Sequence, residues 1–347
     1  MTALLAPERD VDVTVVRRAR RRPARRSGLV LAGLGALLVV VFGARVLLGD
    51  YTITIPDFFR IITGTEIPVA SYIVMEVKLP RALLGVLVGV AFGVGGAVFQ
   101  TTLRNPLASP DIIGVSTGAS AAAVFAIVAL DQTGNWISVA AMAGAIGVAI
   151  LVRLVAGTLL GYRLVLVGIG VAAGLMSVIQ YLFTRADTYD AQLALLWMTG
   201  SLNQVDWPTV RFFAVAFAVL LPLVFWVARA LRITELGQDT AAALGVRPGR
   251  VDLLLLLAVI LVAAAVAAAG PIAFVSFLAG PIARFLNRGR ATLVGAGLVG
   301  AVIVVAADYA ADYMLTDVNY PVGVVTGALG APFLLWLLAV GRAGRKA

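Results

Sequence analysis

Tracts of about twenty apolar residues recur along this chain of 347 residues. A bilayer core of roughly 30 Å needs about 20 such residues in an α-helix, which rises about 1.5 Å per residue. One such tract is compatible with a signal peptide or a buried core helix, but seven are not. The chain is therefore expected to be an all-α, polytopic membrane protein. The seven tracts nearly free of charge are 27–49, 79–99, 137–160, 164–184, 208–230, 251–269 and 322–340.

The pattern of apolar segments and breaks predicts ten transmembrane helices. One of them, 275–286, is short: at about 1.5 Å per residue it rises only about 18 Å, so it cannot cross the bilayer core alone and is expected to be a broken helix. The ten predicted segments are 28–48, 80–102, 110–130, 137–160, 164–184, 208–230, 251–269, 275–286, 292–312 and 322–340.

Basic residues are distributed unevenly between the two sides of this predicted bundle. With the N-terminus in the cytoplasm, 21 of the 27 Lys and Arg residues fall on the inner side, as the positive-inside rule requires. The opposite orientation inverts this bias, and removing one helix scrambles it. We therefore expect both termini to be cytoplasmic. The basic residues left on the outer side are Arg45, Arg60, Lys78, Arg81, Arg185 and Arg211.

Composition excludes most catalytic chemistry. The chain has no Cys and no His, so thiolate sites and imidazole-based acid–base or metal sites are excluded. Its two lysines, Lys78 and Lys346, do not follow a glycine-rich loop, which a phosphate-binding P-loop requires. We therefore predict no catalytic residue, no metal site and no cofactor. If ATP drives this protein, another chain hydrolyses it.

The N-terminal tail, residues 1–27, is rich in arginine. It is compatible with a twin-arginine export signal, with a nucleic-acid-binding patch, or with a disordered cytoplasmic anchor that touches anionic lipid head groups. We favour the anchor and expect no nucleic-acid partner. The run 28–48 is longer than a signal-peptide core and has no small-residue cleavage motif after it. Residues 28–342 are then the transmembrane domain.

Two segments break the helical pattern within apolar sequence. In 104–111 (Arg-Asn-Pro-Leu-Ala-Ser-Pro-Asp), Ser109 is placed to cap the next helix. The small polar face that follows suits either close packing or a water-filled path. The second break is Gly270-Pro271, echoed by Gly280-Pro281, and each pair removes a backbone donor. Such breaks mark either a transport pathway or a re-entrant turn that only packs. Candidate pathway residues are Ser116, Thr117 and Ser120.

The cytoplasmic loop 231–250 differs from the other connections, which are short. It reads as a short helix closed by Gly245. Such a helix either rests on the bundle or docks a cytoplasmic partner, and we favour docking.

Three motifs carry a family resemblance: 78–81 (Lys-Leu-Pro-Arg), 105–108 (Asn-Pro-Leu-Ala) and 320–333, which begins Tyr-Pro-Val-Gly and ends Ala-Pro-Phe. In order and spacing they resemble the FecCD permeases of bacterial ABC importers for iron–siderophore complexes, haem and cobalamin. The resemblance implies a ten-helix subunit in the bacterial inner (plasma) membrane. It also implies four kinds of partner: the lipid bilayer, a second permease in a homo- or heterodimer, two cytoplasmic ATPase subunits, and an extracytoplasmic siderophore-binding protein.

The resemblance also implies roles for individual residues. Lys78 and Arg81 would be exposed on the outer surface and face carboxylates of the binding protein, and Asn105 and Leu107 would constrict the cytoplasmic mouth. Within the loop 231–250, residues 235–246 would be the coupling helix that sits in a groove of the ATPase. Its coupling residues would be Glu235, Leu236, Gly237, Asp239, Ala242, Leu244 and Gly245.

The chain departs from the family pattern after the first Gly-Pro pair, at the segment that contains the second. Many relatives have Val-Pro-His-x-x-Arg there, whereas this chain has Ala279 to Arg284 without a histidine. The change favours the ferric-siderophore branch, so the expected function is the permease subunit of an ATP-driven importer of Fe(III)–siderophore. The alternatives are a haem or cobalamin importer permease, or an ion-coupled secondary transporter.

Overall fold

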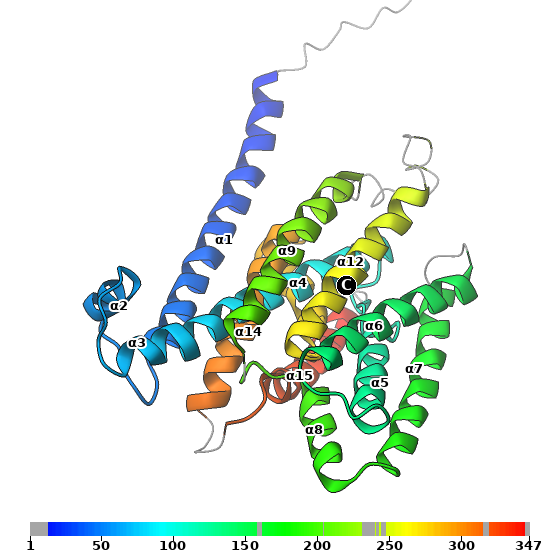
Figure 1. The fold of residues 1–347 in the computed structure, drawn as a ribbon. Coiled ribbons are helices and arrows are strands. Elements are labelled where there is room, and N and C mark those ends of the chain that lie inside the picture. Colours follow the sequence, from blue (N-terminus) through cyan, green and yellow to red (C-terminus); the bar gives the residue numbers. More distant parts are fainter. Residues whose placement is uncertain are drawn as a thin grey trace, which may run out of the picture.

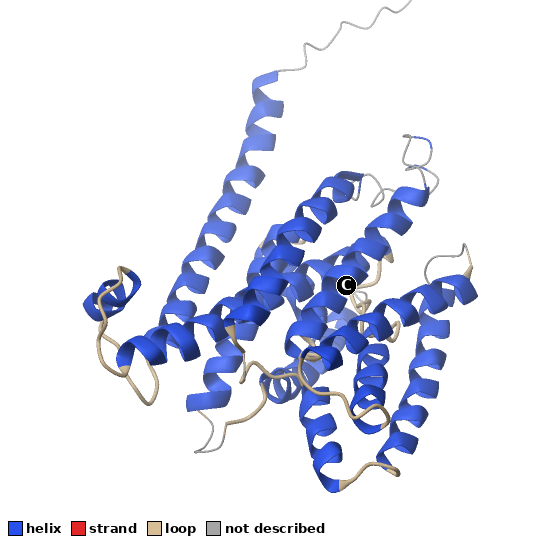
Figure 2. Ribbon diagram, in the orientation of Figure 1, coloured by secondary structure: helices blue, strands red, loops and turns tan. Residues whose placement is uncertain are grey.

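The computed structural model describes residues 13–157, 162–203, 205–230, 240, 243, 248–314 and 319–343. Every regular element among them is a helix, and none of these residues lies in a strand (Figures 1 and 2). The elements are α1 (Val13–Leu47), α2 (Ile55–Ile62), α3 (Ala70–Tyr72), the π-helical turn η1 (Ile73–Lys78), α4 (Leu79–Thr102), α5 (Val115–Val128), α6 (Asn135–Ala156), α7 (Tyr162–Phe183), α8 (Thr188–Thr199), α9 (Trp207–Val227), η2 (Ala228–Ala230), α12 (Pro248–Ala269), α13 (Val275–Leu286), α14 (Leu293–Tyr313) and α15 (Val322–Ala343).

Each of the ten predicted segments overlaps with one of these helices. By length and composition, seven spans in the described chain are able to cross a membrane. The apolar helices α5 and α13 are shorter, as is the described apolar part of α15, 322–335. The chain is thus an all-helical, multi-pass membrane protein. The ten crossings and the cytoplasmic termini remain predictions.

Helix α4 forms the centre of the bundle. It continues from α3 and η1 without a break. In this continuous span, Ala70–Thr102, 78% of the most apolar 18-residue stretch is buried. Glycines on α4 let its neighbours approach closely: a Cβ atom on Gly89 would lie 2.6 Å from Cα of Ala301 in α14. A Cβ atom on Gly93 would collide with the carbonyl of Ala296. Small residues at helix contacts are how membrane helices gain packing area where lipid supplies no hydrophobic drive.

A second group of helices packs beside α4. Helix α5 contacts α6, α7 and α8. Helix α12 contacts α6 and α9 on one side and α4 on the other, so it joins this group to α4. One continuous apolar core runs through both groups. Helix α9 begins with an Asp206 cap that accepts a hydrogen bond from the backbone N–H of Thr209 over 3.0 Å. The hydrogen bonds from Thr209 lower the pKa of the Asp206 carboxyl.

Three local expectations differ from the structure. Residues 13–27, expected to be disordered, belong to α1, because Arg and Ala are strong helix formers and extend a helix that the membrane span already nucleates. Helix α5 begins at Val115 after Gly114, whose φ is +86°, so the buried Ser109 does not cap it. The short helices α2 and α8 were not predicted.

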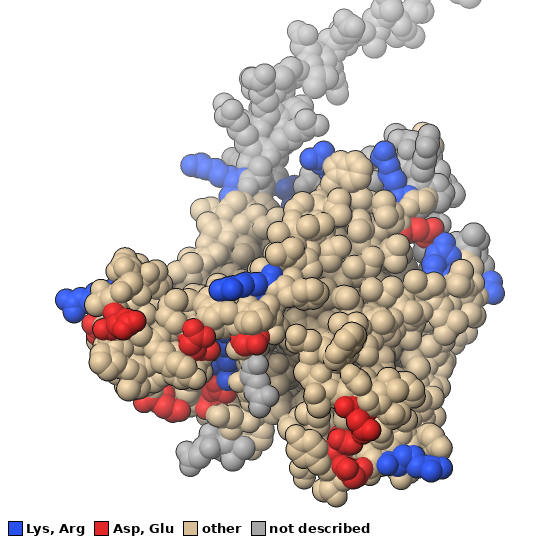
Figure 3. Space-filling model, in the orientation of Figure 1, with Lys and Arg blue, Asp and Glu red and all other residues tan. Residues whose placement is uncertain are grey.

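Charge is segregated along the bundle. Figure 3 shows most of the visible Lys and Arg near the end from which the N-terminal part of α1 projects, and most of the visible Asp and Glu near the opposite end. We call the arginine-rich end the inner end and the other the outer end. The names follow the positive-inside rule.

Candidate functional site

The predicted pathway residues line one cavity. Ser116, Thr117 and Ser120 lie on one face of α5 and border a cavity of about 460 Å³. Ser116 donates its hydroxyl hydrogen to the carboxylate of Asp111, which also lines the cavity. We call this the central cavity. Its other lining residues are Ser109, Ile112, Met176, Ile179, Met198, Pro271, Ile272, Ala273, Phe274, Phe277 and Leu334.

The first Gly-Pro break forms a wall of the central cavity. Helix α12 ends at Ala269, Gly270 has a φ of +70°, and the turn 271–274 leads into α13. The loop after α8 partners the exposed backbone, because Ser201 N–H donates to Ala269 O over 2.8 Å. A Cβ atom on Gly200 would lie 2.6 Å from Pro271 O. Non-helical backbone at this depth is therefore packed against protein and also faces a cavity, the two settings in which a membrane tolerates it.

The second Gly-Pro pair does not break a helix, contrary to expectation. Helix α13 runs from Val275 to Leu286 through Pro281. A proline removes the N–H that would bond the carbonyl four residues earlier, which is that of Phe277. Gln100 of α4 replaces this donor: its Nε2 donates to Phe277 O over 3.0 Å. A Cβ atom on Gly280 would collide with Gln100 Oε1, so Gly280 makes room for the side chain.

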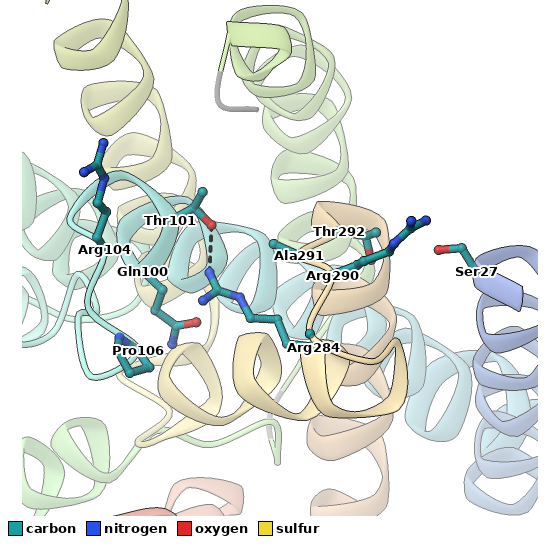
Figure 4. A pocket seen from close by; sticks show the side chains of 10 residues that line it. Ser27, Gln100, Thr101, Arg104, Pro106, Arg284, Arg290, Ala291 and Thr292 are labelled. Carbon is teal, nitrogen blue, oxygen red and sulfur yellow. Dashed lines mark hydrogen bonds between the residues drawn. The ribbon is translucent and has the colours of Figure 1, made fainter. Parts of the chain in front are cut away.

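The predicted gate residues lie in the loop between α4 and α5. The Asn105 side chain is exposed and accepts a hydrogen bond from Leu107 N–H over 2.9 Å. This side-chain turn holds the loop where α4 ends. Leu107 is half-buried and does not line the central cavity. The loop instead borders a second chamber at the inner end, through Arg104 and Pro106 (Figure 4).

The two predicted docking residues are buried rather than exposed. Lys78 is 3% exposed and Arg81 is 7% exposed. Lys78 Nζ donates to the carbonyl oxygens of Leu48 and Tyr51, each over 2.7 Å. These carbonyls follow the end of α1, where a cation is favoured by the helix dipole. The expected exposure is wrong because internal partners use both side chains.

Arg81 belongs to a buried cluster of four charges at the outer end, which we call the ion-pair cluster. Arg81 Nη2 lies 2.7 Å from Asp308 Oδ1, and Nη1 lies 2.8 Å from Asp312 Oδ2. Arg45 of α1 binds the same carboxylates at 2.6 and 3.0 Å. All four side chains are at most 8% exposed. Two positive and two negative charges balance, which is how ionisable groups persist within membrane helices. The cluster joins α1, α4 and α14.

Sequence reasoning missed the partners in these networks. Asp308 and Asp312 are four residues apart and so face the same side of α14; that spacing was the available signal. Nothing in the sequence placed Arg45 beside them, since the contact joins residues 263 positions apart. The bond from Gln100 to α13 depends on tertiary packing and has no signal in the sequence.

The seven coupling residues, Glu235, Leu236, Gly237, Asp239, Ala242, Leu244 and Gly245, lie outside the described residues. The helix after this loop is anchored nearby. Asp252 Oδ2 in α12 lies 2.8 Å from Arg153 Nη2 in α6, and both side chains are 36% exposed. This ion pair ties α12, the helix that follows the loop, to α6.

Three comparisons with known proteins agree on the family to which this chain is related. The chain matches the model of the FecCD transport family over residues 37–340. It is 39% identical to the ferric enterobactin transport system permease protein FepG of Escherichia coli K12, over 84% of this chain and 89% of that protein. It is 38% identical to the Fe(3+) dicitrate transport system permease protein FecD of the same organism, over 77% and 85% respectively.

A solved structure has the same fold. An ABC transporter described as being of the metal-chelate type, in an inward-facing conformation, superimposes with a TM-score of 0.79 and 27% identity. The match covers 91% of this chain and 99% of the other. Together with the sequence matches, this confirms the resemblance drawn from the motifs: the chain is a transport subunit and belongs to the FecCD transport family.

Proposed function

We propose that this protein is the transmembrane permease subunit of an ATP-driven importer that moves Fe(III)–siderophore from a binding protein into the cytoplasm of a bacterium. The observation that carries the proposal is the central cavity in a chain of this family. Ser116, Thr117 and Ser120 line the cavity together with the turn that begins at Gly270–Pro271. The similarity to FepG and FecD, a ferric enterobactin permease and an Fe(3+) dicitrate permease, supports the cargo.

The proposed route uses binding and movement without covalent chemistry. Hydroxyl groups and apolar side chains line the central cavity, and such a mixed surface solvates a bulky chelate without holding it tightly. In the proposal, a second permease completes the cavity. An exposed apolar residue in its lining supports this pairing: Met176 is 44% exposed. Asn105 and Leu107 are proposed to close the inner mouth.

Energy is proposed to enter through the loop 231–250, held by one of two cytoplasmic ATPase subunits. The described neighbours Thr240 and Ala243 are helical, which suits a coupling helix. The Arg153–Asp252 ion pair supports transmission from this loop into the bundle. Inserting Gly-Pro between residues 240 and 241 is expected to abolish co-purification of the ATPase. The same insertion within residues 185–187, in the connection between α7 and α8, is the control and should leave co-purification of the ATPase intact. Retention of the ATPase by the first variant would contradict the coupling role.

The binding protein is proposed to dock on the outer end. Lys78 and Arg81 support docking indirectly in this view, because they fix the ends of α1, α4 and α14 that shape the outer surface. Direct contacts fall to exposed groups such as Arg60 of α2.

Transport in proteoliposomes tests the function. The permease is reconstituted with its ATPase and binding protein, and uptake of radiolabelled iron as a ferric siderophore is compared with uptake of haem and cobalamin. We expect ATP-dependent uptake of the iron chelate. Uptake of cobalamin or haem instead would refute the cargo. Uptake by the permease alone, driven by an ion gradient, would refute the importer.

A further inference from the structure

The short helix α2 connects two membrane spans at the outer end. The apolar span of α1 ends at Leu47, and the next span begins at Ala70. Both residues pack in one small apolar core, together with Ile53, Ile61 and Val74. Ile61 belongs to α2, so this core holds α2 at the level where one span ends and the other begins. Helix α2 therefore lies at the height of the membrane surface.

Helix α2 has a second apolar side, which its own core leaves uncovered. Ile55, Phe59 and Ile62 follow the i, i+4, i+7 spacing of one helix face, and they are 61%, 61% and 49% exposed. We call these three residues the exposed face of α2. The charged residues Asp57 and Arg60, whose side chains approach to 3.7 Å, lie on the opposite side by helical periodicity. Helix α2 thus presents apolar and charged side chains in different directions.

Other large apolar side chains near the ends of the two spans are also exposed. Tyr51 follows the end of α1, and Val69 and Tyr72 lie at the start of the next span. Val69 has a φ of +65°, which is a rare backbone conformation for a β-branched residue. Tyrosine is enriched at membrane–water interfaces because its ring is apolar and its hydroxyl group is polar. This composition is typical of a surface at the boundary between lipid and water.

The surroundings of α2 favour lipid as the partner of its exposed face. In the adjacent span of α1, only 17% of the most apolar stretch is buried, and Val39 and Val40 are exposed there. Figure 1 shows α2 set apart from the bundle beside the end of α1. It is seen nearly end-on, whereas α1 runs along the page, so α2 lies across the direction of α1. An amphipathic helix in this orientation lies in the plane of the membrane surface.

We propose that α2 is an interfacial helix that lies in the head-group region of the outer leaflet. Its exposed face enters the acyl chains next to the head groups, and Asp57 and Arg60 point to water. A binding protein approaches from the water and would meet the charged side. A second permease, in the arrangement proposed above, packs near Met176 of α7, and Figure 1 shows α7 and α2 at opposite edges of the bundle. Lipid is the partner that lies beside α1 at this level.

Spin labelling of the full-length permease in phospholipid vesicles tests the proposal. The chain contains no cysteine, so each single-cysteine variant carries one nitroxide label. Phe59→Cys places the label on the exposed face of α2, and Arg60→Cys, the matched control, places it on the charged side. Both positions are exposed, so both variants should fold. Val39→Cys supplies the reference for a label among acyl chains.

The measured quantity is the accessibility of each label to two relaxing agents. Molecular oxygen concentrates among acyl chains, whereas a neutral nickel chelate stays in water. We expect the ratio of oxygen accessibility to nickel accessibility to be several-fold higher for Phe59→Cys than for Arg60→Cys, and to approach the ratio for Val39→Cys.

Two further labels extend the test along the helix: Ile55→Cys and Ile62→Cys should give the same high ratio as Phe59→Cys. Equal ratios for Phe59→Cys and Arg60→Cys would overturn the proposal, because both sides of α2 would then lie in water. A label at Phe59→Cys that neither agent reaches would also overturn it, and would assign the exposed face to a contact with protein. Loss of oxygen accessibility only after the binding protein is added would assign the face to that partner instead of lipid.

Discussion

The side chain of Gln100 donates a hydrogen bond from Nε2 to the carbonyl oxygen of Phe277, a carbonyl that Pro281 leaves without its helical donor. The bond lets α13 keep a proline in its interior while it packs against α4. A buried carbonyl without any partner is destabilising by about 1–3 kcal/mol. The polar residue on one helix thus compensates the proline on another.

This relationship predicts a non-additive pair of substitutions. Gln100→Leu should lower the free energy of unfolding by about 1–3 kcal/mol, because Phe277 O loses its donor. Pro281→Ala restores a backbone N–H at that position. In the Pro281→Ala background, Gln100→Leu should therefore be much less harmful. The measurement is a double-mutant cycle of thermal unfolding in detergent, and strictly additive effects would show that the two residues act separately.

The ion-pair cluster predicts a loss of stability when its charge balance is disturbed. Arg81→Gln leaves Asp308 and Asp312 with Arg45 alone, and removing one partner of a buried pair typically is destabilising by about 3–5 kcal/mol. Adding Asp312→Asn removes the surplus negative charge and should recover much of that loss. The measurement is the amount of folded, monodisperse protein after heating.

Arg60→Gln is the control for this experiment. Arg60 is 68% exposed and lies 3.7 Å from Asp57, and exposed pairs of this kind contribute about 0–1 kcal/mol. A stable Arg81→Gln protein that fails only in transport would contradict the structural role and restore a direct docking role for Arg81.

Close approach between α4 and its neighbours predicts opposite effects for two glycine substitutions. A Cβ atom on Gly96 would collide with the carbonyl of Ser276, whereas one on Gly147 of α6 would meet no atom within 4 Å. Gly96→Ala should therefore destabilise the bundle. Gly147→Ala should stabilise it by about 0.5–1 kcal/mol, since alanine is the better helix former. Equal shifts in melting temperature for both variants would mean that α4 is not packed as described.

The sequence predicted the helices better than the contacts between them. Apolar tracts locate membrane helices because the bilayer imposes their length, and all ten predicted segments overlap with helices. Burial of Lys78 and Arg81 was not predictable in this way. A basic residue near a helix end looks the same in the sequence whether it faces water or a carboxylate, and Arg81 meets its carboxylates 227 and 231 positions further along the chain. Ser116, Thr117 and Ser120 were found because helical spacing alone puts them on one face.

The central cavity predicts a transport defect without a folding defect. Thr117 lines the cavity and is half-buried, so Thr117→Trp should fill space that the cargo needs while leaving the helix contacts of α5 in place. We expect uptake of the ferric siderophore to fall to background in proteoliposomes, with ATP hydrolysis by the assembled complex retained. Leu151→Trp, at a position 48% exposed on α6, is the matched control and should transport normally. If Thr117→Trp transports as well as the control, the cavity is not the route, and the polar face of α5 serves only to pack against its neighbours.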